Sequence, residues 1–304
     1  MNKKKDLTVM LVFLFFAFAP LWIAAFAYFG SGHEYGDAGT QLLCSAAMLC
    51  PTVSVFITGA ICKEKIDFTG ENSLKLGIYF KDKKWIWMLV AIFLPWVYKE
   101  IGGWLFLAFN PECFDTTSFV QEQGMDASLI AVMPLYSVVN AMMFSIGGLG
   151  EEIGWRGFMM PRLEKKMGIG PAILVGGIIW GVWHYPVNYY GHNFGTGYWG
   201  EPWLGFLIFT IFTISMNALL TLAVKKTNSV WSAAFMHAVN NGAATFSRML
   251  MNGENLTGFW AESTVQFVIM LGPSLVFGII AYIWLIKLER QEKTAKAREE
   301  VQAA

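Results

Sequence analysis

Two adjacent glutamates followed by an arginine form the most unusual polar segment of this sequence. Glu151 and Glu152 come directly after an apolar run, residues 128–149, and Arg156 follows four residues after Glu152. Ionisable side chains at membrane depth are costly and usually mark a functional site. On a helix, Glu152 and Arg156 are neighbours and can pair, whereas Glu151 points about 100° away and has no expected local partner. We therefore expect one neutralised carboxylate and one free carboxylate.

Two of the four histidines also fall within apolar segments. His184 follows Trp180 by one helical turn, and His237 precedes Asn241 by one turn, so each pair can lie on one side of a helix. One such histidine alone is more typical of a helix–helix hydrogen bond. Together with Glu151, however, two imidazoles and an amide would supply a base for water and donors for a developing oxyanion. These groups are what water-mediated acyl transfer requires.

The composition places these groups in a membrane protein. Of the 304 residues, 55% are hydrophobic and only 14% are charged, whereas soluble domains have about 25% charged residues. Eight apolar segments have about the 20 residues that a helix needs to cross the bilayer: residues 8–29, 40–62, 85–109, 128–149, 171–190, 203–224, 229–250 and 265–286. We predict an all-α polytopic membrane protein with eight transmembrane helices, in one transmembrane domain (1–286) with a charged tail (287–304).

The charges of the connections predict the orientation. In the eight-helix arrangement, 20 of the 22 lysines and arginines fall on one side, and the opposite connections (30–39, 110–127, 191–202 and 251–264) carry acidic residues and no basic ones. By the positive-inside rule, both the N-terminus and the C-terminus are cytoplasmic. The basic residues flank membrane spans, so we expect contact with the lipid bilayer and no nucleic-acid partner. We expect an integral protein of a bacterial cell membrane.

Two further features have structural explanations. The four cysteines lack the spacing of metal ligands, which is typical of small apolar residues in a helix bundle. Lys99 and Glu100 lie near the middle of the third predicted span and point to different faces of it. They either line a cavity or pair structurally with another helix.

The motifs resemble those of the CPBP intramembrane protease family, also called the Abi family, which includes the type II CAAX prenyl endopeptidases. Three family motifs occur in order on the predicted spans: Glu-Glu-x-x-x-Arg at Glu151, Glu152 and Arg156, Phe-x-x-x-His ending at His184 with Trp180 in place of phenylalanine, and His-x-x-x-Asn at His237 and Asn241. The resemblance covers about residues 128–245. It implies that Glu152 and Arg156 form a structural pair, and the tryptophan keeps an aromatic wall.

The resemblance further implies an endopeptidase that works within the membrane. By this analogy, Glu151 is the general base and His184 helps to orient and activate the water. His237 and Asn241 would stabilise the oxyanion. The predicted site would face the cytoplasm and act on a membrane-associated peptide or protein, for which a prenylated CAAX tail is the family precedent.

Two schemes of water activation are possible, one with a bound zinc ion and one without a metal. Members of the family are often labelled metalloproteases, but no His-Glu-x-x-His segment is present to bind zinc from one helix. Glu151, His184 and His237 could still form a three-ligand zinc site. We favour a glutamate-activated water with no tightly held metal.

Two other classes of function remain as alternatives. A member of the same family could be a non-catalytic membrane scaffold or a bacteriocin-immunity-type protein, although the intact residue set argues against this. A transporter could use the buried polar groups to bind an ion or a small substrate. A transporter would be expected to have interrupted helices and a repeated architecture.

Overall fold

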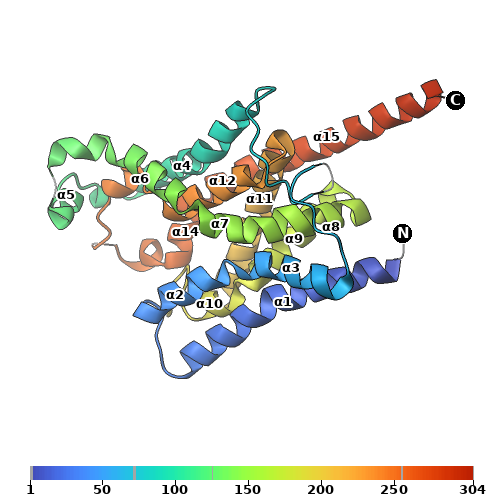
Figure 1. The fold of residues 1–304 in the computed structure, drawn as a ribbon. Coiled ribbons are helices and arrows are strands. Elements are labelled where there is room, and N and C mark those ends of the chain that lie inside the picture. The colour runs from blue at the N-terminus through green and yellow to red at the C-terminus, as the bar shows by residue number, and fades with distance from the viewer. Residues whose placement is uncertain (1–2, 71–72, 125, 255, 304) are drawn as a thin grey trace.

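The computed structural model describes residues 3–70, 73–124, 126–254 and 256–303 (Figure 1), with the side chains of residues 3, 4 and 303 left out. The predicted domain 1–286 and tail 287–304 thus begin and end on residues outside this description. Within the described ranges the chain is helical, and its only β-pairing is an isolated bridge between Phe114 and Met251. The all-α prediction is confirmed.

The helices in chain order are α1 (Lys3–Gly30), α2 (Ala38–Ala47), α3 (Cys50–Cys62), α4 (Lys84–Phe109), η1 (Pro111–Cys113), α5 (Ser118–Gln123), η2 (Ala127–Ala131), α6 (Met133–Met143), α7 (Ser145–Glu152), η3 (Ile153–Met159), α8 (Met160–Met167), α9 (Ile169–Trp183), α10 (Tyr185–Tyr189), α11 (Trp203–Thr227), α12 (Val230–Gly242), α13 (Phe246–Met249), η4 (Gly258–Ala261), α14 (Ser263–Leu271) and α15 (Pro273–Ala303). The element η3 is a π-helix.

Fewer helices are long enough to span a bilayer than the sequence predicts. Four described segments qualify by length and composition, namely most of α1, α2 with α3, α4, and α11. Two bent pairs bring the number to at most six: α6 with α7 to α8, bent by 50°, and α14 with α15, bent by 47°. The predicted spans at 171–190 and 229–250 are shorter, because α9 has 15 residues and α12 has 13.

Two of the predicted spans are interrupted near a proline. The predicted span at 171–190 breaks at His184, directly before α10, which carries Pro186 in its first turn. The span at 265–286 breaks after Gly272, and Pro273 begins α15. Proline is accommodated in the first turn of a helix but removes a hydrogen bond from its interior. Interrupted helices, which the transporter alternative also expects, are therefore present.

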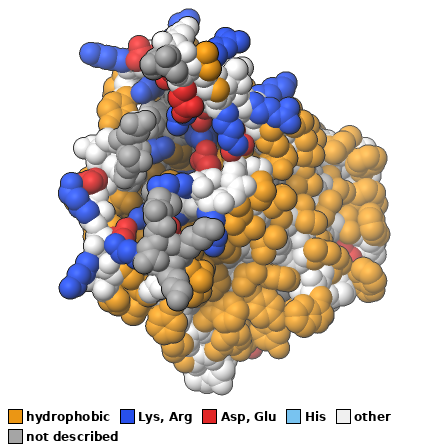
Figure 2. Space-filling view, turned by 90° about the vertical axis from the view of Figure 1, so that its right-hand side faces the viewer, with side chains coloured by type: hydrophobic (Ala, Val, Ile, Leu, Met, Phe, Trp, Pro, Cys, Tyr) orange, Lys and Arg blue, Asp and Glu red, His pale blue; other side chains and the backbone are white. Residues whose placement is uncertain are grey.

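The surface has the character of a membrane protein. Large apolar side chains are exposed on many helices, including Leu11, Phe15 and Ile23 on α1. On the face drawn in Figure 2, charged side chains gather on one side and hydrophobic side chains cover most of the remainder. An exposed apolar surface of this extent indicates contact with lipid. Both labelled chain ends lie at the same end of the molecule (Figure 1).

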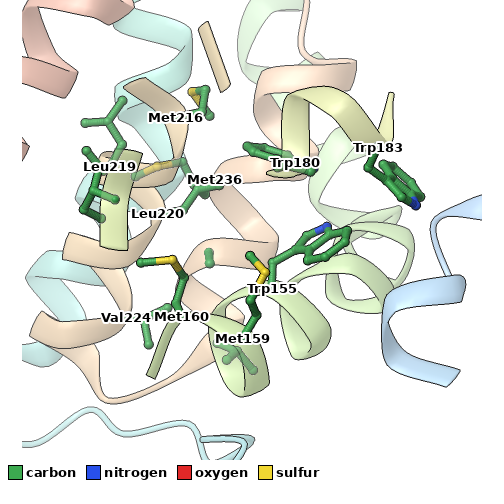
Figure 3. Packing of buried hydrophobic residues seen from close by; sticks show 14 of the residues in the cluster. Trp155, Met159, Met160, Trp180, Trp183, Met216, Leu219, Leu220, Val224 and Met236 are labelled. Atoms are coloured by element: carbon green, nitrogen blue, oxygen red, sulfur yellow. The ribbon is translucent and has the colours of Figure 1, made fainter. Parts of the chain in front are cut away.

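The core brings α7, α9, α11 and α12 together. Met216 and Leu220 of α11 pack in one cluster with Trp180 of α9 and Met236 of α12 (Figure 3). A glycine allows α7 to approach α12 closely, because a Cβ atom on Gly148 would lie only 2.9 Å from the carbonyl oxygen of Ala234. One turn further along both helices, the polar side chains of α7 therefore reach those of α12.

Candidate active site

The two glutamates are the last two residues of α7 and are followed by the π-helix η3. Glu151 and Glu152 are only 2% and 0% exposed, and Arg156, within η3, is 2% exposed. Single π-helical turns are rare and occur frequently at functional sites. The chain therefore buries three ionisable groups where its helical geometry is irregular.

Glu152 joins an arginine and a histidine. Arg156 Nη1 donates to Glu152 Oε1 at 3.0 Å, which is the pair that the spacing predicts. His237 Nδ1 lies 2.8 Å from the same oxygen, and since a carboxylate accepts, this nitrogen carries the proton and donates. Glu152 therefore also orients the imidazole of α12, a contact that the sequence did not indicate.

Glu151 is bound by two tryptophans. Trp155 Nε1 donates to Glu151 Oε2 at 3.2 Å, and Trp180 Nε1 donates to the same oxygen at 2.8 Å. The prediction that Glu151 lacks a local partner is therefore wrong, because Trp155 stands four residues later on the same face. Both donors are neutral, so neither indole neutralises the carboxylate. The nearest cationic candidate is His237, whose Nε2 lies 3.9 Å from Glu151 Oε1.

Trp180 connects the parts of the site. Its indole N–H reaches Glu151, and its ring lies 5.4 Å from the ring of His237, centroid to centroid. The guanidinium carbon of Arg156 lies 4.2 Å from the centre of the indole, in cation–π contact. Trp180 is therefore more than an aromatic wall. Its indole N–H binds Glu151, whereas the phenylalanine that the family motif has at this position carries no N–H group.

The backbone of Trp180 also orients His184. The carbonyl oxygen of Trp180 lies 2.9 Å from His184 Nδ1. Because a carbonyl only accepts, Nδ1 carries the proton, and Nε2 of the neutral imidazole is left with its lone pair. His184 is half-buried, packed edge-on against Trp183 and Phe209. Its Nε2 can therefore accept a hydrogen bond or a proton.

Asn241 lies at the exposed end of the group. It follows His237 by one turn near the C-terminus of α12, and its side chain is exposed. Asn240 Nδ2 donates to Asn241 Oδ1 at 2.9 Å. No hydrogen bond engages Asn241 Nδ2 in the described part of the chain. The amide therefore presents its NH₂ end outward.

Lys99 and Glu100 bind backbone groups at the end of α12 and at the start of α13. Lys99 Nζ donates to the carbonyl oxygens of Asn240 and Ala243, which are left over at the helix C-terminus. Glu100 accepts from the backbone N–H groups of Phe246 and Ser247, in the first turn of α13. These contacts support structural pairing, and Glu100 also lines a groove between α4 and α6.

The structure thus brings the predicted residues into one chain of contacts. Arg156, Glu152, His237 and Glu151 are linked through side chains, and Trp180 adds His184. Asn241 joins the group only through its position on α12. The four linked ionisable groups are at most 3% exposed, and the more accessible members of the group are His184 and Asn241. The cytoplasm-facing cavity stays a prediction.

The zinc alternative requires three ligand side chains around one position. Among the residues that the structure describes, no three His, Cys, Asp or Glu side chains come close enough to hold one ion. In the triad of Glu151, His184 and His237, oxygen atoms engage both Nδ1 atoms and two N–H groups engage Glu151 Oε2, which leaves both Nε2 atoms and Oε1 as the possible ligand atoms. As placed, these three side chains do not surround a common ion position. Metal dependence stays a prediction for direct measurement.

Comparisons with known proteins agree with the motifs. Residues 131–243 match the family described as type II CAAX prenyl endopeptidase Rce1-like. The chain is also similar to CAAX prenyl protease 2 of Methanococcus maripaludis, with 27% identity over 93 residues. That similarity covers 30% of this chain and 34% of the relative. The family match, residues 131–243, includes all three motifs.

Proposed function

We propose that the chain, whose residues 131–243 match the family of Rce1-like type II CAAX prenyl endopeptidases, is an intramembrane endopeptidase in which Glu151 activates the attacking water. One observation carries this assignment. Both indole donors bind Oε2 of Glu151, so Oε1 is left without an N–H donor within hydrogen-bonding distance among the described residues. A buried carboxylate oxygen in that position is available to a water molecule.

The first step is proton transfer from water to Glu151. The water donates one hydrogen to Glu151 Oε1 and another to the lone pair of His184 Nε2, which fixes its orientation. Its oxygen then attacks the carbonyl carbon of the scissile peptide bond as the proton moves to Glu151. General-base assistance of this kind contributes about 10²- to 10⁴-fold to the rate.

The second step is collapse of the tetrahedral intermediate. Its oxyanion accepts hydrogen bonds from His237 Nε2–H and from the NH₂ group of Asn241. Glu152, which accepts from His237 Nδ1, favours the imidazolium form that has a proton on each nitrogen. Glu151 returns its proton to the leaving amine, the C–N bond breaks, and the products are a carboxylic acid and an amine.

The proposed substrate class is a membrane-associated peptide or protein. The relative's name specifies a CAAX prenyl protease, and a CAAX motif is a C-terminal segment whose cysteine carries a prenyl chain. A prenyl chain holds such a segment at the membrane. This agrees with a site surrounded by helices with lipid-facing apolar surfaces. The resemblance extends to about a third of each chain, so the substrate belongs to the proposal.

The two alternatives are less well supported. A scaffold or immunity-type protein needs no base, yet Glu151 and His184 each have an oxygen or nitrogen atom free for water. The interrupted helices that a transporter would have are present, but the matched family is one of endopeptidases. An assay of hydrolysis separates all three.

The experiment is cleavage in oxygen-18 water. The purified protein in liposomes receives a peptide ending in a prenylated CAAX motif, its unprenylated twin, and an unrelated membrane-anchored peptide. Mass spectrometry should find a cleaved prenylated peptide with one oxygen-18 atom in its new carboxylate. Full recovery of all three peptides after prolonged incubation would contradict the proposed activity.

A further inference from the structure

The C-terminus of α12 is held by three consecutive residues of α4, Tyr98, Lys99 and Glu100, named here the α4 clamp. Tyr98, which is fully buried, donates its hydroxyl proton to Asn240 Oδ1. Lys99 binds two carbonyl oxygens at the end of α12, and Glu100 binds two N–H groups at the start of α13. The clamp therefore contacts the chain immediately before and after Asn241.

These contacts satisfy backbone groups that the two helix ends leave unpaired. Backbone N–H and C=O groups that stay unpaired away from water lower the stability of a fold. The ammonium of Lys99 pairs with carbonyl groups at the end of α12, and the carboxylate of Glu100 pairs with N–H groups at the start of α13. Both charges also have the sign that the respective helix ends favour. Their presence in the middle of an apolar helix is thereby explained without a role in chemistry.

The hydrogen bond of Tyr98 has a further consequence for the amide of Asn241. A side-chain amide can turn by 180°, and its orientation is set by its partners. Tyr98 binds the oxygen of Asn240, which directs the NH₂ group of Asn240 toward Asn241 Oδ1. The oxygen of Asn241 is thereby engaged, and its NH₂ group is the end left free. An oxyanion needs N–H donors, so only this orientation is productive.

We propose that the α4 clamp, through Asn240, is a positioning device that presents the NH₂ end of Asn241 to the oxyanion. The proposal rests on the proposed endopeptidase function. None of its members touches the reacting atoms. Tyr98 and Asn240 fix the orientation of the amide, while Lys99 and Glu100 fix the position of the helix end that carries it.

The test combines Tyr98→Phe with Asn241→Ala. Tyr98→Phe should lower kcat about 10-fold with KM changed less than about twofold, the size expected for one hydrogen bond. In an Asn241→Ala background, Tyr98→Phe should cause no further loss. Equal fold-losses in both backgrounds, or unchanged kcat in the single variant, would overturn the proposal. Tyr282→Phe removes a hydroxyl from α15, away from α12, and is the matched control with unchanged kcat.

A second variant guards against loss of folding. Asn240→Asp keeps an oxygen for Tyr98 but has no N–H₂ group for Asn241. It should reproduce the kcat loss of Tyr98→Phe. A kcat equal to that of the wild type would contradict the relay.

A spectroscopic measurement separates this proposal from the activity itself. In protein labelled with nitrogen-15 asparagine, the side-chain resonance of Asn241 is the one that Asn241→Ala removes. Tyr98→Phe should shift or broaden it, and Tyr282→Phe should not. If no peptide is cleaved but the resonance responds, the proposed function fails and the orienting contact stands. An unchanged resonance would overturn the clamp whether or not the protein is a protease.

Discussion

Trp180 Nε1 donates a 2.8 Å hydrogen bond to Glu151 Oε2, which ties the indole of α9 to the carboxylate of α7. A phenylalanine at this position, as in the family motif, cannot make this bond. The carboxylate of this protein is therefore oriented by a residue of its own second motif.

Trp180→Phe should lower kcat while leaving the protein folded. A hydrogen bond to a charged group contributes about 1.5–3 kcal/mol, which corresponds to about 10- to 100-fold in rate if the base loses its orientation. Steady-state cleavage kinetics measure the effect. Trp231→Phe is the control, because it also removes an indole N–H bond, to the carbonyl oxygen of Leu76, at the opposite end of α12 from Asn241. Equal kcat values for the two variants would exclude an orienting role for Trp180.

Glu152→Ala should destabilise the protein. It leaves Arg156 buried without its carboxylate and removes the acceptor of His237. Removing one partner of a buried ion pair costs about 3–5 kcal/mol, so the melting temperature in detergent should fall by on the order of 10 °C. Glu164→Ala, which breaks the more exposed pair with Lys225, should change it far less. An unchanged melting temperature for Glu152→Ala would contradict the structural pair.

The stability should fall in mild acid because of His192. Burial lowers the pKa of His192 to about 4, and its Nδ1 is hydrogen-bonded to the hydroxyl of Tyr35 in the α1–α2 connection. The unfolded chain takes up this proton near pH 6.5. The free energy of unfolding should therefore decrease as the pH falls from about 6.5 to 4. Melting temperatures of His192→Gln should depend less on pH across this window, and a parallel dependence would rule out this histidine.

Cleavage should not require a tightly bound metal. If a glutamate-activated water performs the reaction, purified protein should contain far less than one equivalent of zinc and keep its activity after chelation. Elemental analysis and the cleavage assay, carried out on the same chelated sample, measure both quantities. Stoichiometric zinc together with loss of activity on chelation would replace the glutamate scheme by the zinc alternative.

The sequence predicted the local part of the site better than the long-range part. The Glu152–Arg156 pair follows from a spacing of four, and the same spacing would have identified Trp155 as a partner of Glu151. The partners of Lys99 come from α12, more than a hundred residues later, where spacing carries no information. Trp180 replaces the phenylalanine of the family motif. The sequence shows this replacement but not the direction of the indole N–H group, which the packing of α9 against α7 determines.

The helical class was predictable, and the continuity of the helices was not. Hydropathy averages over a window, so the run at 128–149 reads as one span although the chain bends at Phe144 between α6 and α7. The prolines at 186 and 273 do mark the other breaks. Whether a proline bends a span or begins a new helix depends on the packing around it.

The most direct test of Glu151 as the base is the cleavage rate of Glu151→Gln in liposomes, compared with the wild type and with Glu112→Gln, a change at an exposed position of η1. Glutamine keeps the size of the side chain but cannot take a proton from water. The cleavage rate should fall about 10²- to 10⁴-fold for Glu151→Gln and stay at the wild-type value for Glu112→Gln. Both variants should melt cooperatively. A Glu151→Gln rate within a few-fold of the wild type would contradict the assignment of Glu151 as the base.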